Sequence, residues 1–262
     1  MNSALKTFDG SRKVWRPWTL WKVALICSIL VVASFSWYGA SSMQNHVERE
    51  AIEDHSTGGK EDEEVRLKRL KSDKRLPLVY FDVAIKERKV GRIEMVLFTD
   101  VSPRSAHNFH LLVTGEAGKV PPGLEGEGLP LHFKGAPFYR IIDGFIDQAG
   151  INTPSALNLG QFDDDEGGLK LKHEHKGLLS MANMGPNTNT AHFSIMINPA
   201  PHLDGHYTIF GQVVSGFEVV DEINALSRGK PENTATADEG AIIADCGEIR
   251  RGTIKVPKKV VF

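Results

Sequence analysis

Residues 137–150 read Pro-Phe-Tyr-Arg-Ile-Ile-Asp-Gly-Phe-Ile-Asp-Gln-Ala-Gly, and this stretch decides the fold. Residues 138–142 and 144–148 are rich in aromatic and β-branched side chains, so they predict two short strands. Because side chains alternate along a strand, Arg140 should point to one face of the first strand. Taken by itself, this arginine would be interpreted as one partner of a surface salt bridge.

Similar short segments continue toward the N-terminus. Residues 79–85 and 91–98 predict two strands joined by a polar turn. A helix is expected to begin at Pro103, with Ser102 as its N-cap, and to end at Gly115.

Toward the C-terminus the chain carries further strand segments and a second helix. A Gly- and Pro-rich loop is predicted at residues 115–128 and the second helix at residues 218–226. The remaining strands are predicted at residues 177–182, 193–197, 207–214 and 241–247. Two helices among about eight short strands indicate a mainly β protein, with a barrel whose ends are covered by helices.

Composition excludes several classes of protein. The formal net charge of -2 gives no electrostatic reason to expect a nucleic-acid partner. The chain has 2 cysteines, Cys27 and Cys246, which lie far apart in unrelated apolar segments. Neither a disulfide framework nor a Cys-rich zinc site is therefore expected.

Four ordered stretches resemble the signature sequences of the cyclophilins, a family of peptidyl-prolyl cis–trans isomerases. They lie at residues 137–150, 177–189, 203–211 and 242–247. The resemblance extends without a break from about residue 77 to residue 250. It implies a closed eight-stranded antiparallel β-barrel capped by two helices, and it implies neither a cofactor nor a metal.

The resemblance also implies which residues form the site. Arg140 matches the family's catalytic arginine, and Gln148 is placed to orient that arginine or a substrate carbonyl. The matching substrate-binding positions are Phe145, Ile146, Ala182, Asn183, Met184, His192, Ser194, Leu203 and Tyr207. Backbone groups at Asn183 would hold the substrate chain as an added strand. From the pattern alone, Asn183 is a turn residue and the apolar positions are ordinary core.

The chemistry of this reaction needs no nucleophile and no metal. A prolyl peptide bond has lost most of its trans preference but still faces a barrier of about 18–20 kcal/mol. Since the barrier comes from amide resonance, no covalent bond has to break. An apolar pocket for the proline ring, with a guanidinium that donates a hydrogen bond to the twisted amide, would lower it.

Six positions of the expected pocket differ from the residues that the family usually has. They are Ile146 (usually methionine), Met184 (usually alanine), His192 (usually glutamine), Ser194 (usually phenylalanine), His202 (often tryptophan) and Tyr207 (usually histidine). Ser194 removes a ring from the pocket floor, and Tyr207 and Met184 are candidates to refill the space. We expect an enzyme that is slower and more selective than a typical member and that binds cyclosporin weakly. The alternative is a prolyl-peptide binding or scaffold module with weak or no turnover.

Two polar segments carry side chains that can bind metals. His173-Glu174-His175, with His202 and His206 nearby in sequence, has no third ligand at zinc spacing. The acidic run at residues 163–168 lacks the alternating ligands of a calcium loop. Both segments are predicted to be solvated surface loops.

The N-terminal part predicts a membrane anchor. Residues 23–43 carry no charge and are mostly apolar, while residues 1–22 are basic. All 4 tryptophans lie near the two ends of the apolar segment, at positions 15, 18, 21 and 37. The positive-inside rule places residues 1–22 in the cytoplasm and the isomerase domain across the membrane, in the lumen. We expect this membrane to be that of the ER or Golgi; a mitochondrial or plastid membrane is the alternative location, although residues 1–22 lack a clear transit-peptide pattern. The alternative is a signal peptide cleaved near Ala40, with the product in the secretory lumen.

The remaining segments complete the expected organisation. Residues 44–76 are a charged stalk with too little apolar surface to fold alone, in which residues 63–70 could form a solvated helix. The isomerase domain is expected at residues 77–252, followed by a C-terminal tail at 253–262. The expected protein is a monomer that acts on proline-containing polypeptides and assists their folding.

Overall fold

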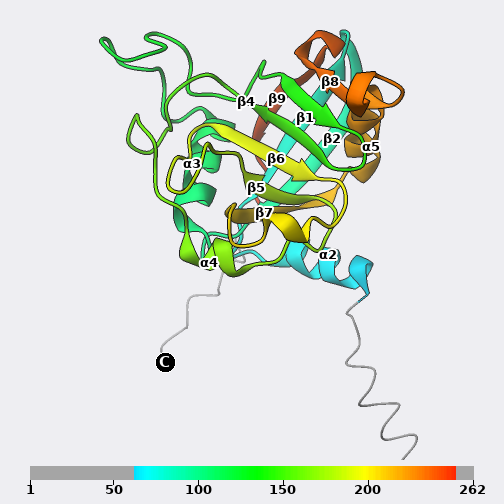
Figure 1. The fold of residues 1–262 in the computed structure, drawn as a ribbon. Coiled ribbons are helices and arrows are strands. Elements are labelled where there is room, and N and C mark those ends of the chain that lie inside the picture. The colour runs from blue at the N-terminus through cyan, green and yellow to red at the C-terminus, as the bar shows by residue number, and fades with distance from the viewer. Residues whose placement is uncertain (1–61, 252–262) are drawn as a thin grey trace, which may run out of the picture. The chain divides into compact units, whose positions relative to one another are not determined.

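The computed structural model describes residues 62–251, and one curled antiparallel sheet of nine strands dominates them (Figure 1). The strands are β1 (Leu78–Ile85), β2 (Arg88–Leu97), β3 (Phe138–Ile142), β4 (Ile146–Gly150), β5 (Leu178–Met181), β6 (His192–Met196), β7 (Ile209–Ser215), β8 (Thr234–Thr236) and β9 (Ala241–Glu248). Their spatial order is β8-β3-β4-β6-β5-β7-β2-β1-β9. The described part of the chain is therefore mainly β, as predicted.

The predicted number of eight strands is wrong, because the sheet contains β8 as a ninth. This strand pairs with β3 but has only three residues, too few to show an alternating pattern. The curl brings Pro137, just before β3, to an isolated bridge with Ile242 of β9. The backbone N–H of Ile243 also donates to the carbonyl of Ala136 at 2.9 Å. The closed barrel of the prediction is thus a curled sheet joined through this bridge, without a full ladder between its end strands.

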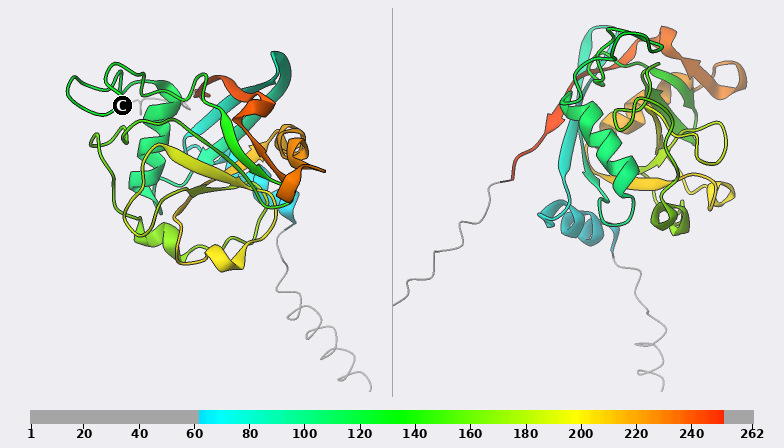
Figure 2. Two further views of the ribbon diagram at one scale, coloured as in Figure 1. Left: turned by 45° about the horizontal axis from the view of Figure 1, so that its top comes forward. Right: turned by 90° about the vertical axis from the view of Figure 1, so that its left-hand side faces the viewer.

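Helices α3 (Pro103–Thr114) and α5 (Phe217–Asn224) lie on opposite sides of the curled sheet and are the two predicted caps (Figures 1 and 2). The other helices of the described residues are α2 (Glu63–Ser72), the short α4 (Glu166–Lys170) and four 3-10 turns. Gly115 ends α3 in the left-handed conformation, with φ 71°, as its position predicted.

The N-terminus of α3 is capped by a distant residue. Ser102 stands at the N-cap position but makes no side-chain cap, because its hydroxyl donates to the carbonyl of Ile209 at 2.6 Å. The carboxylate of Asp165 instead accepts hydrogen bonds from the backbone N–H groups of Arg104 at 3.1 Å and Ser105 at 2.8 Å. These are two of the N–H groups that a helix leaves without an internal partner. Ser102 is therefore the N-cap residue, as predicted, but the side chain that caps the helix is that of Asp165.

The acidic run at residues 163–168 has Asp163 and Glu166 exposed, but its prediction as a solvated loop is wrong for Asp165. Asp165 is 4% exposed and caps α3. Asp164 accepts hydrogen bonds from the side chain of Asn189 at 2.7 Å and from the backbone N–H of Asn187 at 2.9 Å of a second loop. The two carboxylates thus accept hydrogen bonds from N–H groups of neighbouring segments that would otherwise lack a partner.

The main core lies inside the curl. Five phenylalanines form its centre, with ring centroids 5.0–6.0 Å apart: Phe81, Phe109, Phe133, Phe193 and Phe210. A second apolar cluster includes Ile146 and Met196 and is separate from the first. Because alternate residues of a strand face opposite ways, Phe193 joins the inner core while its neighbour Ser194 faces outward. The outer face of β3, β4 and β6 is therefore available for a site.

Helix α2 forms where the sequence predicted a solvated helix, but it packs on the sheet. Leu67 and Leu70 contact an apolar cluster that contains Val96 of β2 and Val214 of β7. Arg251 donates to the carbonyl of Lys71 at 2.7 Å and so ties the end of α2 to the chain after β9. The compact unit accordingly begins at Glu63.

The predicted basic segment 1–22, anchor 23–43 and tail 253–262 lie outside the described residues, as does most of the stalk. Within residues 62–251 there is no helix of the length and apolar character that a membrane crossing needs.

Candidate functional site

A row of cross-strand neighbours builds the site. In the pairing of β3, β4, β6 and β5, Arg140 lies opposite Gln148, Gln148 opposite Ser194, and Ser194 opposite Ser180. Directly opposed residues of antiparallel strands project to the same face of the sheet. Four polar side chains therefore stand side by side on the outer face.

Around this row lies a cavity of about 300 Å³, which we call the Arg140 cavity. Its walls are Arg140, Phe145, Ile146, Gln148, Ser180, Met181, Ala182, Asn183, Ser194, Met196, His202, Leu203 and Tyr207. A cavity of this size that combines apolar walls with a few polar groups is the usual form of a ligand site. Nine of the eleven predicted site residues line it.

Arg140 is held at the rim of this cavity. Its guanidinium donates a hydrogen bond to the side-chain oxygen of Gln148 at 3.3 Å, and the residue is exposed. One donor group is thereby fixed by the strand register, while the other N–H groups of the guanidinium remain available for a ligand. The contact that the sequence predicted between these two residues is present.

The apolar side of the cavity is formed by Phe145, Leu203 and Ile146. Phe145 packs against His202 with ring centroids 5.4 Å apart. Ile146 is 5% exposed and belongs to the cluster beneath the cavity, to which Phe145 and Leu203 also pack. These residues belong both to the apolar core and to the cavity wall. Their interpretation as ordinary core and their interpretation as substrate-binding positions are therefore compatible.

Asn183 offers a backbone edge beside the cavity. Its side chain is engaged locally, donating to Asn189 at 3.1 Å and accepting from the backbone N–H of Gly185 at 3.3 Å. Within residues 62–251, no backbone hydrogen bond involves the N–H or C=O of Asn183. Both groups can therefore pair with an extended peptide.

Met184 and His192 line a neighbouring cavity of about 230 Å³, the Met184 cavity. It shares Gln148, Ala182 and Asn183 with the Arg140 cavity. Met184 is 90% exposed, so it does not fill the space left by Ser194. Of the two candidates for that space, Tyr207 alone reaches the wall of the Arg140 cavity.

Three residues of the Arg140 cavity, Ser180, Met181 and Met196, are absent from the prediction. A fourth, His202, is predicted only as a pocket position that differs from the family and not as a binding residue. Met196 lies two residues from Ser194 on β6, so strand alternation could have indicated it. Ser180 lies opposite Ser194 on β5, and it could have been found only if the pairing of these two strands were known. The roles of all these side chains in binding or catalysis remain predictions.

A buried histidine supports the cavity from behind. The His173 side chain is 0% exposed, and its two ring nitrogens lie 3.0 Å from the Asp204 carboxylate and 3.0 Å from the Ser180 hydroxyl. Burial lowers the pKa of His173 despite the nearby carboxylate. The prediction of a surface loop is therefore wrong for His173. No group of three or more His, Cys, Asp or Glu side chains in the described segment is arranged to hold a metal ion.

Asp147 of β4 carries a buried carboxyl group on the interior face of the sheet. It is 0% exposed, and its Oδ1 accepts a hydrogen bond from the side-chain amide of Asn224 at 2.8 Å. Its Oδ2 is buried without a hydrogen-bond partner in the described residues. Burial raises the pKa of Asp147 to about 8, and the hydrogen bond from Asn224 opposes this only in part.

The fold and the cavity define a protein of the cyclophilin class, and comparison with known sequences agrees. Residues 80–248 match the profile of the family described as cyclophilin type peptidyl-prolyl cis-trans isomerase/CLD. The chain belongs to this family.

A particular relative is a protein of Rhizopus delemar named peptidyl-prolyl cis-trans isomerase cyp11. It is 40% identical over 194 residues, which cover 69% of this chain and 52% of the relative. The chain thus spans about half the length of the curated relative it matches.

The protonation of Asp147 gives a prediction for stability. Its pKa is raised from 3.8 to about 8 in the folded state, so between these values the folded state holds a proton that the unfolded state has lost. The free energy of unfolding should therefore fall with rising pH across this window, by at most about 1.4 kcal/mol per pH unit from this group. In Asp147→Asn, which keeps the acceptor for Asn224, this part of the slope should vanish. Urea unfolding at several pH values between 5 and 8 measures it.

A matched control is Asp143→Asn, which alters an exposed carboxylate of the same hairpin. It should keep the pH slope of the wild-type chain. Equal slopes for the wild-type chain and Asp147→Asn would show that Asp147 is ionised in the folded state at neutral pH.

Proposed function

We propose that this chain is a peptidyl-prolyl cis–trans isomerase that acts on Xaa-Pro bonds of flexible or unfolded polypeptides. The observation that carries the proposal is the position of Arg140. Its guanidinium is fixed by Gln148 at the rim of a cavity whose opposite walls are apolar. A proline ring in the cavity would place the preceding peptide group near this charge.

The proposed mechanism is stabilisation of the twisted amide. When the prolyl bond rotates, resonance is lost and the nitrogen gains basic character. An N–H group of Arg140 donates a hydrogen bond to this nitrogen, which stabilises the twisted form more than either planar form. The apolar walls at Phe145 and Leu203 hold the ring, and the backbone of Asn183 holds the chain.

We propose further that the activity is lower than that of a typical family member. Ser194 is 7% exposed on the floor of the cavity, and it offers little apolar contact to a ring. Losing one aromatic wall weakens binding by about 1–3 kcal/mol. The same observation supports the second candidate function, a prolyl-peptide binding module with weak or no turnover.

Membrane attachment is a separate proposal, supported by the sequence of residues 1–43 alone. We propose that residues 23–43 anchor the chain with its isomerase domain in the lumen of the ER or Golgi. In microsomes, the domain should be protected from added protease, and the full-length chain should resist carbonate extraction. Release of a product shortened near Ala40 would support the cleaved signal peptide instead.

The role of Arg140 is tested by exchange NMR on a short Xaa-Pro peptide with the full-length chain. Arg140→Ala should slow catalysed exchange by about a hundredfold to a thousandfold, because the donor to the twisted amide is lost. Peptide affinity should change much less, since the cavity walls remain. The matched control is Arg228→Ala, which removes an exposed arginine paired with Asp143.

Two results would contradict the enzyme proposal. Exchange that is equally fast with the Arg140→Ala variant would remove this residue from the mechanism. Peptide binding by the wild-type chain without any acceleration of exchange would favour the binding module.

The contribution of the cavity floor is tested by Ser194→Phe. A ring at this position should tighten binding of the same peptide by about tenfold, because it restores apolar contact. Ser194→Ala is the control and should have little effect. The wild-type chain should bind cyclosporin more weakly than micromolar, and His202→Trp should tighten that binding. Submicromolar cyclosporin binding together with rapid turnover would contradict the expectation of reduced activity.

A further inference from the structure

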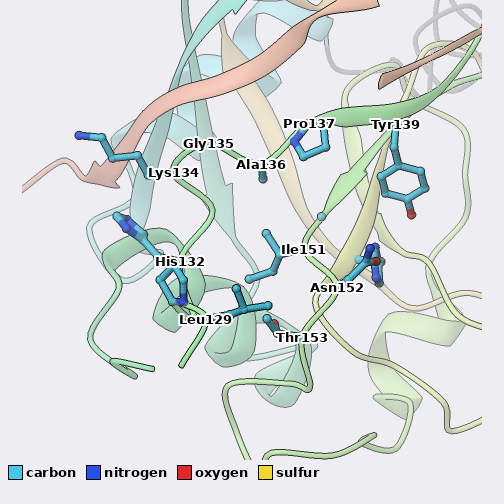
Figure 3. Close-up of a pocket in the computed structure, with 13 residues that line it drawn as sticks. Leu129, His132, Lys134, Gly135, Ala136, Pro137, Tyr139, Ile151, Asn152 and Thr153 are labelled. Atoms are coloured by element: carbon cyan, nitrogen blue, oxygen red, sulfur yellow. The ribbon is translucent and has the colours of Figure 1, made fainter. Parts of the chain in front are cut away.

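A third cavity, of about 520 Å³, lies beyond the Met184 cavity, and we call it the Leu129 cavity. It is lined by Leu129, Pro130, His132, Lys134, Gly135, Ala136, Pro137, Tyr139, Gly150, Ile151, Asn152, Thr153 and His192. Figure 3 shows Leu129 and Thr153 at the bottom of the cavity and Pro137 and Tyr139 at the top, with Ile151 between them. The volume falls within the range of about 300–1,000 Å³ that ligand sites have.

The Leu129 cavity is continuous with the site already described. Tyr139 and His192 line both this cavity and the Met184 cavity. Gln148, Ala182 and Asn183 line both the Met184 cavity and the Arg140 cavity. The three cavities therefore form one row, in which each shares walls with the next.

Strand geometry gives the length of this row. On β6, His192 at the Leu129 cavity lies two residues from Ser194 at the Arg140 cavity, and along β3 Pro137 lies three residues from Arg140. At about 3.3 Å per residue these spacings correspond to about 7–10 Å. A fully extended peptide covers the same distance in two to three residues, and a less extended one needs about four. A peptide with its proline in the Arg140 cavity can therefore place a side chain about two to four residues away into the Leu129 cavity.

Lys134 and His132 of the Leu129 cavity are already engaged elsewhere, and burial lowers the pKa of His192, whose Nδ1 has no hydrogen-bond partner within the described residues. Lys134 pairs with Asp245 at 2.9 Å and extends away from the other labelled side chains (Figure 3). The Nε2 of His132 lies 3.2 Å from the carbonyl of Val113 and 3.3 Å from the Cys246 sulfur. What remains toward the cavity is mostly apolar, with Leu129 exposed by 47%. An anionic ligand would find no free cation among these groups.

Two polar groups are free to hold a peptide backbone. No hydrogen bond involves the Tyr139 hydroxyl or the Asn152 side-chain amide within residues 62–251, and both line the Leu129 cavity. The Tyr139 ring is fixed edge-on against His192, with centroids 5.4 Å apart. Burial raises the pKa of Tyr139 to about 12, so its hydroxyl stays protonated and can donate. Fixed polar groups beside an apolar hollow match a peptide that carries an apolar side chain.

We infer that the Leu129 cavity is a second recognition site for the same client polypeptide, and that it binds a leucine- or phenylalanine-sized side chain about two to four residues from the isomerised proline. The inference rests on the proposed function for the place of the proline. The chain should therefore bind most tightly to client polypeptides in which an apolar residue lies at this distance from a proline. Short substrates that end before this residue would not use the cavity.

The test uses the full-length chain and peptides of about eleven residues with one proline. Leucine or serine is placed two, three or four residues before or after the proline, and the dissociation constants are measured by NMR titration. For at least one position, the leucine peptide should bind about tenfold more tightly than the serine peptide. Leu129→Ala should reduce this ratio to about threefold or less. The backbone hydrogen bonds of Leu129 with Val120 and Gly126 are kept in this variant.

Leu124→Ala is the matched control, since Leu124 is 39% exposed on the same loop but does not line the cavity. It should keep the wild-type ratio. Leucine and serine peptides of equal affinity at every position, or a ratio that Leu129→Ala leaves unchanged, would overturn the inference. A ratio that depends on Leu129 without any acceleration of exchange would support the inference and contradict the isomerase proposal. The two failures are therefore distinguishable.

Discussion

The pairing of β4 between β3 and β6 is the constraint on which the site depends. In this register Arg140, Gln148 and Ser194 face outward together, while Asp147 and Phe193 face the interior. A shift of one residue would exchange the two faces, burying the glutamine and exposing the core phenylalanine. The apolar core inside the curl therefore also fixes the position of the guanidinium outside it.

Long-range polar contacts hold the loops around this register. Asp165 joins the loop before α4 to the start of α3, and His173 joins the following loop to Ser180 behind the cavity. Each contact satisfies groups that would otherwise be buried without partners. The cavity walls are thus set by the fold before any ligand arrives, which reduces the entropy lost on binding.

The sequence predicted the elements that carry a periodic pattern and those named by the cyclophilin signatures. It placed α3, α5 and eight strands, and nine of the eleven predicted site residues line one cavity. It did not find β8, which is too short to show a period. It also misjudged Asp165 and His173, because a solvated loop and a buried hydrogen-bond network have the same composition. The direction of Met184, which lies outside the Arg140 cavity, depends on loop geometry that no local pattern encodes.

The central claim is that a proline ring lies in the Arg140 cavity with its peptide group beside the guanidinium. The most direct test is a crystal structure of the full-length chain with a bound Xaa-Pro peptide. The ring should contact Phe145 and Leu203, and the Arg140 guanidinium should lie within about 3 Å of the prolyl peptide group, still held by Gln148. A proline bound at another surface, or a guanidinium turned away from the peptide, would contradict the claim.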